Sequence, residues 1–206
     1  MIFERKYFYW FSENTKDEEI VRVKDIFYLS RQVSNEPSSE KILSLTQKGI
    51  ILRDISKNEG QLPESFDKYN KIKKNDIVLN PMDLLTGWVD ISNYEGLISP
   101  SYKNLRIIDK SENLNFYLYQ FQKYYKQRIF FNYGEGVSYD YRWGINDYIL
   151  MNFPILRKPI EVQNLIVKNI RNKQDEITKK IENNSKKINL LKNLKDSVID
   201  KELNEI

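Results

Sequence analysis

The chain has 206 residues, 40% of them hydrophobic, and a formal net charge of +4 at pH 7. It contains no Cys and no His, which excludes disulfides, Cys/His zinc sites and every catalytic site that depends on histidine. Because 33 Lys and Arg nearly balance 29 Asp and Glu, binding to a polyanion would need a clustered basic face.

Residues 1–157 predict a globular domain of the α+β class, built from short strands and at least one helix. Residues 21–30 alternate between apolar and polar side chains and are expected to end in a strand. Residues 41–55 favour two strands joined by a turn at Lys48–Gly49. The polar segments 36–40 and 56–76 are expected to form loops. Further strands are expected over residues 76–80, 88–92 and 102–108.

A helix is expected over residues 111–127, where Leu114, Leu118 and Phe121 recur at helical spacing. Ser111 is its expected N-cap. Residues 130–148 combine aromatic side chains with three glycines, which favours a structured loop region. A last strand is expected over residues 148–156, directly before the composition of the chain changes.

Residues 158–206 predict one long helix, since no Gly or Pro occurs in residues 161–203. Pro159 is expected at its first helical position and Glu161 in its first turn. Isoleucine recurs every eleven residues, a repeat that keeps an apolar stripe aligned along a nearly straight helix. The stripe consists of Ile166, Ile170, Ile177, Ile181, Ile188, Leu191, Leu194, Val198 and Ile199.

This stripe needs a partner, because a helix over residues 161–203 would be roughly 65 Å long and would outrun a domain of this size. Packing on its own domain is the alternative, which the length disfavours. The chain supplies no second long helix, so we expect a coiled coil with another copy or another protein. Asn184 lies in line with the stripe near its midpoint. A buried Asn there would fix the register of an antiparallel pair; the alternative is an exposed Asn184.

Catalytic and nucleotide-binding motifs are absent from the sequence, which has neither GxxxxGKS/T nor GxGxxG. Residues 80–83, NPMD, carry Asp83 where adenine aminomethyltransferases have an aromatic residue that stacks on a flipped base. We therefore expect no enzymatic activity. There is no signal segment and no apolar run of about 18 residues, so we expect a cytoplasmic location and no membrane contact.

Residues 49–107 resemble a target recognition domain of a type I restriction–modification specificity subunit. The segments that carry the resemblance are KGIILRDIS, KYNKIKKNDIVLN, NPMDLLTGWVDIS and EGLISPSY, in that order. The junction YRWGINDYILMNFPILRKPIEVQNLIVKNI is similar to the passage from the family's last strand into its conserved spacer helix, although Val162 separates Glu161 from Gln163. The resemblance covers about residues 20–203 and leaves the opening MIFERKYFYWFSEN unassigned.

The resemblance implies a half-sized subunit, because family members commonly carry two recognition domains and two spacer helices, whereas this chain has one of each. Such a subunit would form a homodimer through antiparallel helices and read one half-site of a bipartite target in double-stranded DNA. The helix pair would set the gap between half-sites and dock partner subunits. Those partners would supply the chemistry: a methylase that uses S-adenosylmethionine to methylate adenine at N6, and a restriction subunit that uses ATP and Mg. The chain itself would need no cofactor or metal.

Three loop regions and a lysine-rich turn offer side chains suited to base or phosphate contact. Arg142, in a glycine-flanked aromatic loop, is the first candidate for reading a base. The alternatives are core packing for Tyr141 and Trp143, a surface ion pair for Arg31 and Arg53, and a solvated turn for the lysines. The predicted DNA-binding residues are Arg31, Gln32, Lys48, Arg53, Lys57, Lys73, Lys74, Tyr139, Tyr141, Arg142 and Trp143.

Two other classes of function stay open on the sequence. The chain could be the recognition subunit of another methylase architecture, which the identity of a co-purifying methylase would reveal. It could also be a coiled-coil adaptor without DNA binding, which predicts no salt-dependent affinity for DNA.

Overall fold

The computed structural model describes residues 19–54, 65–136 and 143–204. Four of the predicted DNA-binding residues, Lys57, Tyr139, Tyr141 and Arg142, lie outside these ranges. The contacts between Cα atoms separate two units, residues 1–160 and residues 161–206. The sequence-based boundary lies between residues 157 and 158, close to this division.

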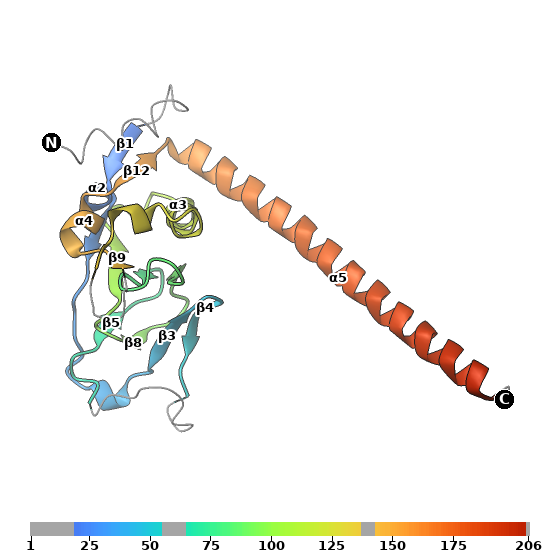
Figure 1. The fold of residues 1–206 in the computed structure, drawn as a ribbon. Helices are drawn as coiled ribbons and strands as arrows, with labels where there is room; N and C mark the ends of the chain where they lie inside the picture. The colour runs from blue at the N-terminus through green and yellow to red at the C-terminus, as the bar shows by residue number, and fades with distance from the viewer. Residues whose placement is uncertain (1–18, 55–64, 137–142, 205–206) are drawn as a thin grey trace. The chain divides into compact units, whose positions relative to one another are not determined.

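A four-stranded antiparallel sheet with the order β2-β9-β6-β7 forms the centre of the first unit (Figure 1). β6 is an inner strand, and all three of its side chains are buried because the sheet is covered on both faces there. The strand at the end of residues 21–30 and the strands over 76–80, 88–92 and 102–108 are confirmed. The strands are β2 (Phe27–Leu29), β6 (Ile77–Leu79), β7 (Val89–Ile91) and β9 (Lys103–Ile107).

Four strand pairs flank this sheet, and the predicted hairpin within residues 41–55 is one of them. Its turn lies at Gln47 and Lys48 rather than at Lys48–Gly49. Gly49 is the first residue of the second strand, with φ of +107°, and an added Cβ would lie 2.3 Å from the Asp90 carboxylate. The pairs are β1 (Glu19–Arg22) with β12 (Pro154–Arg157), β3 (Leu43–Thr46) with β4 (Gly49–Leu52), β5 (Asn70–Ile72) with β8 (Gly96–Ile98), and β10 (Glu135–Gly136) with β11 (Trp143–Gly144).

Two of the predicted boundaries are wrong, and the capping residues give the reason. The helix expected over 111–127 is α3 (Leu114–Lys126), and its N-cap is Asn113, not Ser111, because the Asn113 side chain accepts hydrogen bonds from two backbone amides of the first turn. The first part of the strand expected over 148–156 is instead a helix, α4 (Asp147–Met151), which Asn146 caps by accepting from Ile149 N at 2.8 Å. Strand β12 begins only at Pro154.

The aromatic residues of the first unit make its main core. In α3, Tyr117 and Phe121 lie against Phe27 of β2, with ring centroids 5.4 and 5.9 Å apart. Phe130 and Phe153 extend this cluster, with ring centroids 4.8 Å apart. Because α3 also contacts β7, it crosses the central sheet from one edge strand to the other. The short helices α2 (Val23–Ile26), η1 (Pro37–Ser39) and η3 (Phe130–Tyr133) complete the unit.

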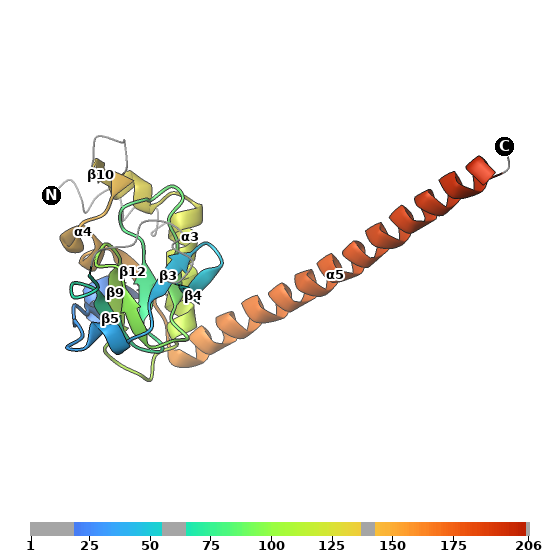
Figure 2. The same ribbon diagram turned by 90° about the horizontal axis from the view of Figure 1, so that it is seen from below.

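The long helix is confirmed as α5 (Ile160–Asn204), with 45 residues. It is continuous and nearly straight in both views (Figures 1 and 2). Glu161 lies in the first turn as expected. Pro159 directly precedes the helix instead of occupying its first position, because the helical hydrogen-bond pattern begins at Ile160.

Candidate nucleic-acid interface

The sequence KKND between β5 and β6 forms a tight turn, residues 73–76, which we call the lysine turn. It joins Ile72 and Ile77, two fully buried residues, so the four polar residues between them must reverse the chain at the surface. Asn75 adopts a left-handed backbone conformation with φ of 72°, which Asn tolerates better than most residues. Lys73 and Lys74 are exposed, whereas Asp76 is buried.

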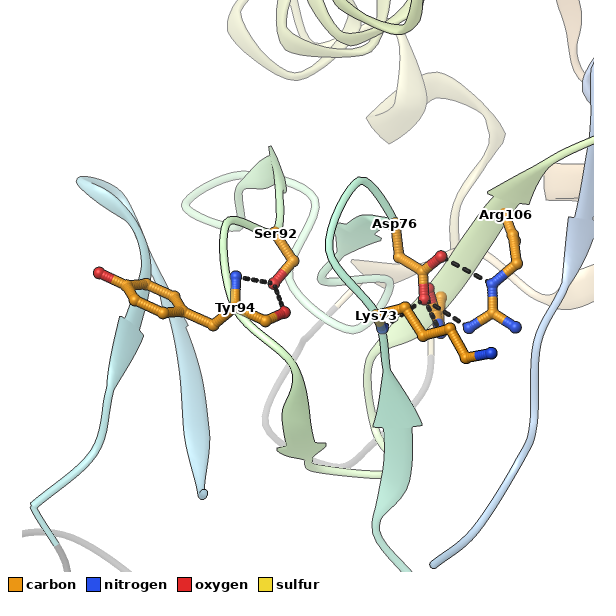
Figure 3. Close-up of polar contacts among 6 residues, drawn as sticks. Lys73, Asp76, Ser92, Tyr94 and Arg106 are labelled. Atoms are coloured by element: carbon orange, nitrogen blue, oxygen red, sulfur yellow. Dashed lines mark hydrogen bonds and ion pairs between the residues drawn. The ribbon is translucent and has the colours of Figure 1, made fainter. Parts of the chain in front are cut away.

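Asp76 holds the lysine turn to the central sheet (Figure 3). Its carboxylate accepts from Lys73 N at 2.8 Å, closing the turn. The same carboxylate binds Arg106 of β9 through two hydrogen bonds of 2.8 and 2.7 Å, and the Asn104 amide donates to it at 3.0 Å. The side chains of Asp76 and Arg106 are 3% and 19% exposed. The hydrogen bonds that Arg106 donates to Asp76 raise the pKa of Arg106 above its ordinary value.

A second turn, residues 92–95 between β7 and β8, lies beside the lysine turn (Figure 3). Asn75 N donates to Ser92 O, and Ser92 N donates to Asp76 O, both at 2.8 Å. The Ser92 hydroxyl donates to Tyr94 O at 2.7 Å and accepts from Tyr94 N at 3.2 Å. These bonds fix the backbone of both turns, so the two exposed lysines stand on a rigid support.

Residues 80–87, the segment that contains NPMD, form a loop shaped by their own side chains. Asn80 Oδ1 accepts from Met82 N at 3.0 Å, and Asp83 Oδ1 accepts from Leu85 N and Thr86 N at 3.1 and 2.9 Å. The carboxylate of Asp83 is thus a turn-forming acceptor.

Two predicted DNA-binding residues border this loop. The turn that contains Lys48 contacts it through Gln47 Nε2, which donates to Thr86 O at 3.0 Å. Trp143 O accepts from Leu84 N at 3.2 Å. The Trp143 side chain is 41% exposed and packs against Phe131 with ring centroids 5.2 Å apart, so it contributes to packing and still presents part of its ring to solvent.

Arg31 and Gln32 lie next to β5, because Gln32 O accepts from Lys71 N at 2.6 Å. Lys71 itself pairs with Glu40, and this hydrogen bond lowers the pKa of Glu40 below its ordinary value. The exposed Arg31 side chain forms an ion pair with Asp147, which was the alternative considered for this residue. Since β5 leads directly into the lysine turn, the structure brings Arg31, Gln32, Lys73 and Lys74 into one region.

Arg53 follows β4, its backbone amide donates to Ile42 O at 2.8 Å, and its side chain is half-buried. Among the residues that the structure describes, Lys48, Lys73 and Lys74 have no ion-pair partner.

Sequence reasoning missed the two acidic residues that organise this surface, Asp76 and Asp147. The sequence did contain an indication for Asp76, because it directly precedes a fully apolar strand. An Asp in that position is expected to close the turn with its carboxylate. Nothing in the sequence linked it to Arg106, which is 30 residues away. Asp147 lies in residues 130–148, which the sequence predicts only as a structured loop region, and it also binds Lys103 Nζ at 2.6 Å.

The charge state of Asp147 should make stability depend on pH. Burial alone would raise its pKa, but the hydrogen bond from Lys103 and the charges of Lys103 and Arg31 outweigh burial and hold the pKa below its ordinary value. A carboxylate with a lowered pKa stabilises the folded state above the ordinary value of about 3.9 and loses this effect as pH falls through the folded-state pKa.

We therefore expect Asp147→Asn to lower the free energy of unfolding by about 1 kcal/mol at pH 7, a partly exposed ion pair's usual contribution. The difference from the wild type should shrink below about pH 4. Urea unfolding from pH 7 down to pH 3 measures it. A difference that stays constant over this range would contradict the ion-pair explanation.

The apolar stripe of α5 is exposed along most of its length. From residue 171 to residue 201 every side chain is exposed, and the seven apolar members of the stripe from Ile177 to Ile199 are between 46% and 64% exposed. Asn184 is exposed in the single chain, while Ile166 and Ile170, near the start of the helix, are half-buried. Such a row of exposed apolar side chains is typical of a surface that binds a partner.

Neither a metal site nor a membrane span is found in the described part of the chain. No group of three or more Asp or Glu residues there could hold a metal ion. No helix in it is both long and apolar enough to cross a membrane.

No protein-family model matches the chain, and no curated protein is similar to it in sequence. Among solved structures, it is similar to the type I restriction-modification system S subunit from M. genitalium, with a TM-score of 0.51, 18% sequence identity and 77% of this chain covered. The HsdS subunit from Thermoanaerobacter tengcongensis matches 79% of this chain with a TM-score of 0.49 and 15% identity. The chain spans 39% of the length of each.

The likeness to the M. genitalium S subunit shows a shared fold. The predicted fold class, an α+β domain of short strands and helices followed by one long C-terminal helix, is thereby confirmed. The solved structure belongs to the kind of protein that residues 49–107 resemble in sequence.

Proposed function

We propose that this chain acts as the DNA sequence-specificity subunit of a type I restriction–modification system. The observation that carries the proposal is the fold shared with the M. genitalium S subunit over 77% of this chain. The sequence resemblance over residues 49–107 supports it independently. In this proposal the first unit binds one half-site of a bipartite target in double-stranded DNA, and the chain performs no chemistry.

Partner subunits in the cytoplasm would act on the site that this chain selects. The methylase would bring S-adenosylmethionine, and the restriction subunit would bring ATP and Mg, so this chain needs no cofactor. We place these partners on the face of α5 opposite the stripe, where polar and charged side chains such as Lys186 are exposed.

The stripe of α5 supports a homodimer. An isolated helix gains little stability from propensity alone and depends on packing of its apolar face, and here that face is exposed over residues 177–199. An antiparallel pair would cover both stripes at once and, being symmetric, would place two first units at its opposite ends. Two recognition domains held at a fixed distance would read a target with two half-sites and a fixed gap.

Asn184 gives this dimer a testable feature. If two Asn184 side chains lie near each other at the centre of an antiparallel seam, Asn184→Ile should stabilise the helix pair by about 1–3 kcal/mol, the cost of burying a polar group imperfectly paired, while relaxing its register. Thermal unfolding and light scattering measure stability and oligomer state. If neither changes, Asn184 does not lie in a seam.

Arg142 remains the first candidate for reading a base. Arg donates two hydrogen bonds to guanine in the major groove, and a good pair of this kind discriminates against the wrong base by about 1–3 kcal/mol. We expect Arg142→Ala to weaken binding to the specific target by more than about 1 kcal/mol and to relax preference at one position. Lys48→Ala, at a lysine that we expect to contact phosphate, should weaken binding to all sequences alike. A loss under about 1 kcal/mol with unchanged preference would remove Arg142 from the assignment.

Sequencing the source genome with detection of base modification, with and without this gene, tests the proposal. Loss of a gapped motif that carries N6-methyladenine would support the specificity role. A palindromic motif would indicate a homodimer, and an asymmetric one a pair of different specificity subunits. If methylation is unchanged while the co-encoded methylase remains active, the proposal is wrong and a coiled-coil adaptor without DNA binding becomes the better interpretation.

A further inference from the structure

We infer that Asp76 is a positioning residue that presents Lys73 and Lys74 to the phosphates of duplex DNA. This inference rests on the proposed function and assigns a mechanism to one part of its DNA-binding surface. Asp76 acts through the backbone of the lysine turn and does not itself touch DNA.

The ion pairs of this region leave Lys73 and Lys74 available. Asp76 is the nearest acidic residue in sequence, but its carboxylate is engaged by both hydrogen bonds from Arg106 and by the Asn104 amide. Lys71, only two residues before Lys73, is by contrast occupied by Glu40. The two exposed ammonium groups of the lysine turn therefore lack an acidic partner among the described residues.

The turn is rigid before any ligand arrives. Asp76 Oδ2 accepts from Lys73 N, Asp76 N donates to Lys73 O at 3.1 Å, and Asn75 N is bound to the neighbouring turn. Two adjacent cations on a fixed backbone lose less conformational freedom on binding than two cations on a mobile loop. In Figure 3 the carboxylate of Asp76 lies between the backbone of the turn and Arg106, so it ties the turn to strand β9.

The chemistry favours phosphates over base edges. A lysine ammonium is a compact point charge on a flexible stem, without the planar fork that lets Arg pair with guanine. Phosphate contacts position a protein on the duplex, and they make affinity fall with salt, with a slope of about −0.9 in log K per phosphate neutralised. Two lysines should therefore account for a slope of about −1.8.

The experiment measures binding of the full-length chain to a labelled random-sequence DNA duplex of about 40 base pairs over a range of salt concentrations. Lys73→Ala with Lys74→Ala should reduce the steepness of the salt slope by about 1.8. Lys24→Ala with Lys110→Ala removes the same charge from two exposed lysines outside the proposed surface and should change it much less. If the wild type shows no salt-dependent binding, the proposed function falls with this inference. If the wild type does show salt-dependent binding but the Lys73/Lys74 variant keeps the full salt slope, only this inference is overturned.

Asp76→Asn then separates positioning from a general effect of charge. Removing a carboxylate would by itself tighten binding to DNA, because the net charge rises. Loss of positioning predicts the opposite, namely weaker binding with a smaller slope, and no further loss when the change is made in the Lys73/Lys74 variant. Unchanged or tighter binding, or an equal loss in both backgrounds, would overturn the inference.

A measurement on the wild type covers the case in which Asp76→Asn does not fold. Hydrogen exchange at the Lys73 amide should already be slow without DNA, because that N–H donates to Asp76 in the free chain. Protection that appears only after the duplex is added would overturn the inference, since the turn would then be ordered by DNA.

Discussion

Ile181→Lys together with Ile188→Lys should convert the proposed dimer into a monomer. Both isoleucines belong to the stripe of α5 and are more than half exposed in the single chain, at 60% and 53%. They lie seven residues apart, so both face the same side of the helix. In an antiparallel pair each copy contributes both side chains, and the double change therefore affects four buried positions.

The size of the effect follows from the burial of these side chains. Covering an exposed isoleucine stabilises association by about 1.5–3 kcal/mol, and replacing it with Lys adds the cost of burying or displacing a charge. Even at the low end of this range, four positions contribute about 6 kcal/mol, which corresponds to a dissociation constant raised by more than 10³-fold. Analytical ultracentrifugation of the full-length chain measures the change.

The matched control is Asn193→Lys with Ser197→Lys. Both positions are exposed and lie on the opposite side of α5 from Ile181 and Ile188, and the control adds the same two charges. It should leave the dimer intact. A variant with lysines in the stripe that still dimerises would show that another surface holds the copies together, or that the helix binds a different partner.

The helix α5 could be predicted because its information is local. Its 45 residues contain neither Gly nor Pro, and its apolar side chains recur every eleven residues. These features specify a helix without reference to any distant residue. The hairpin of β3 and β4 is local in the same way, since a short polar turn joins two apolar segments. The turn was misplaced by one residue because Gly49, with φ of +107° and close to the Asp90 carboxylate, is already the first residue of the second strand.

One of the missed elements depends on a distant strand, and the other depends on a local capping bond. β5 has the sequence NKI and carries no strand signal of its own, and it forms because β8 pairs with it, Ile72 opposite Gly96. Residues 148–151 are apolar enough for a strand, but Asn146 caps a short helix there instead. In both places tertiary contacts or a capping bond override the local pattern.

The surface proposed for DNA was only partly visible in the sequence, for a related reason. Lys73 and Lys74 could be recognised as part of a basic turn from the local sequence alone. The ion pairs that hold this region together could not be recognised from the sequence. Arg106 is 30 residues from Asp76, and Asp147 is 116 residues from Arg31. No periodicity or spacing links residues so far apart, and only the fold brings them into contact.

Asp76→Ala is expected to have the largest effect on the stability of the first unit. It removes the acceptor of Arg106, of the Asn104 amide and of Lys73 N in one step. Breaking a buried ion pair by deleting one partner typically lowers the free energy of unfolding by about 3–5 kcal/mol, because the other charge stays buried without compensation. Asp67→Ala, at an exposed carboxylate of the same unit, should change it by less than about 0.5 kcal/mol.

A double-mutant cycle shows whether the ion pair is the cause. Arg106→Ala added to Asp76→Ala should cost less than the sum of the two single changes, because the double variant leaves no unpaired charge behind. We expect the coupling free energy to exceed about 1 kcal/mol, as for residues in direct contact. Urea unfolding of the four proteins at pH 7 gives all the values required. Additive costs would mean that Asp76 stabilises the turn through Lys73 N and Asn104 alone, and that Arg106 contributes only its packing against Tyr28, whose ring centroid lies 6.0 Å from the guanidinium carbon.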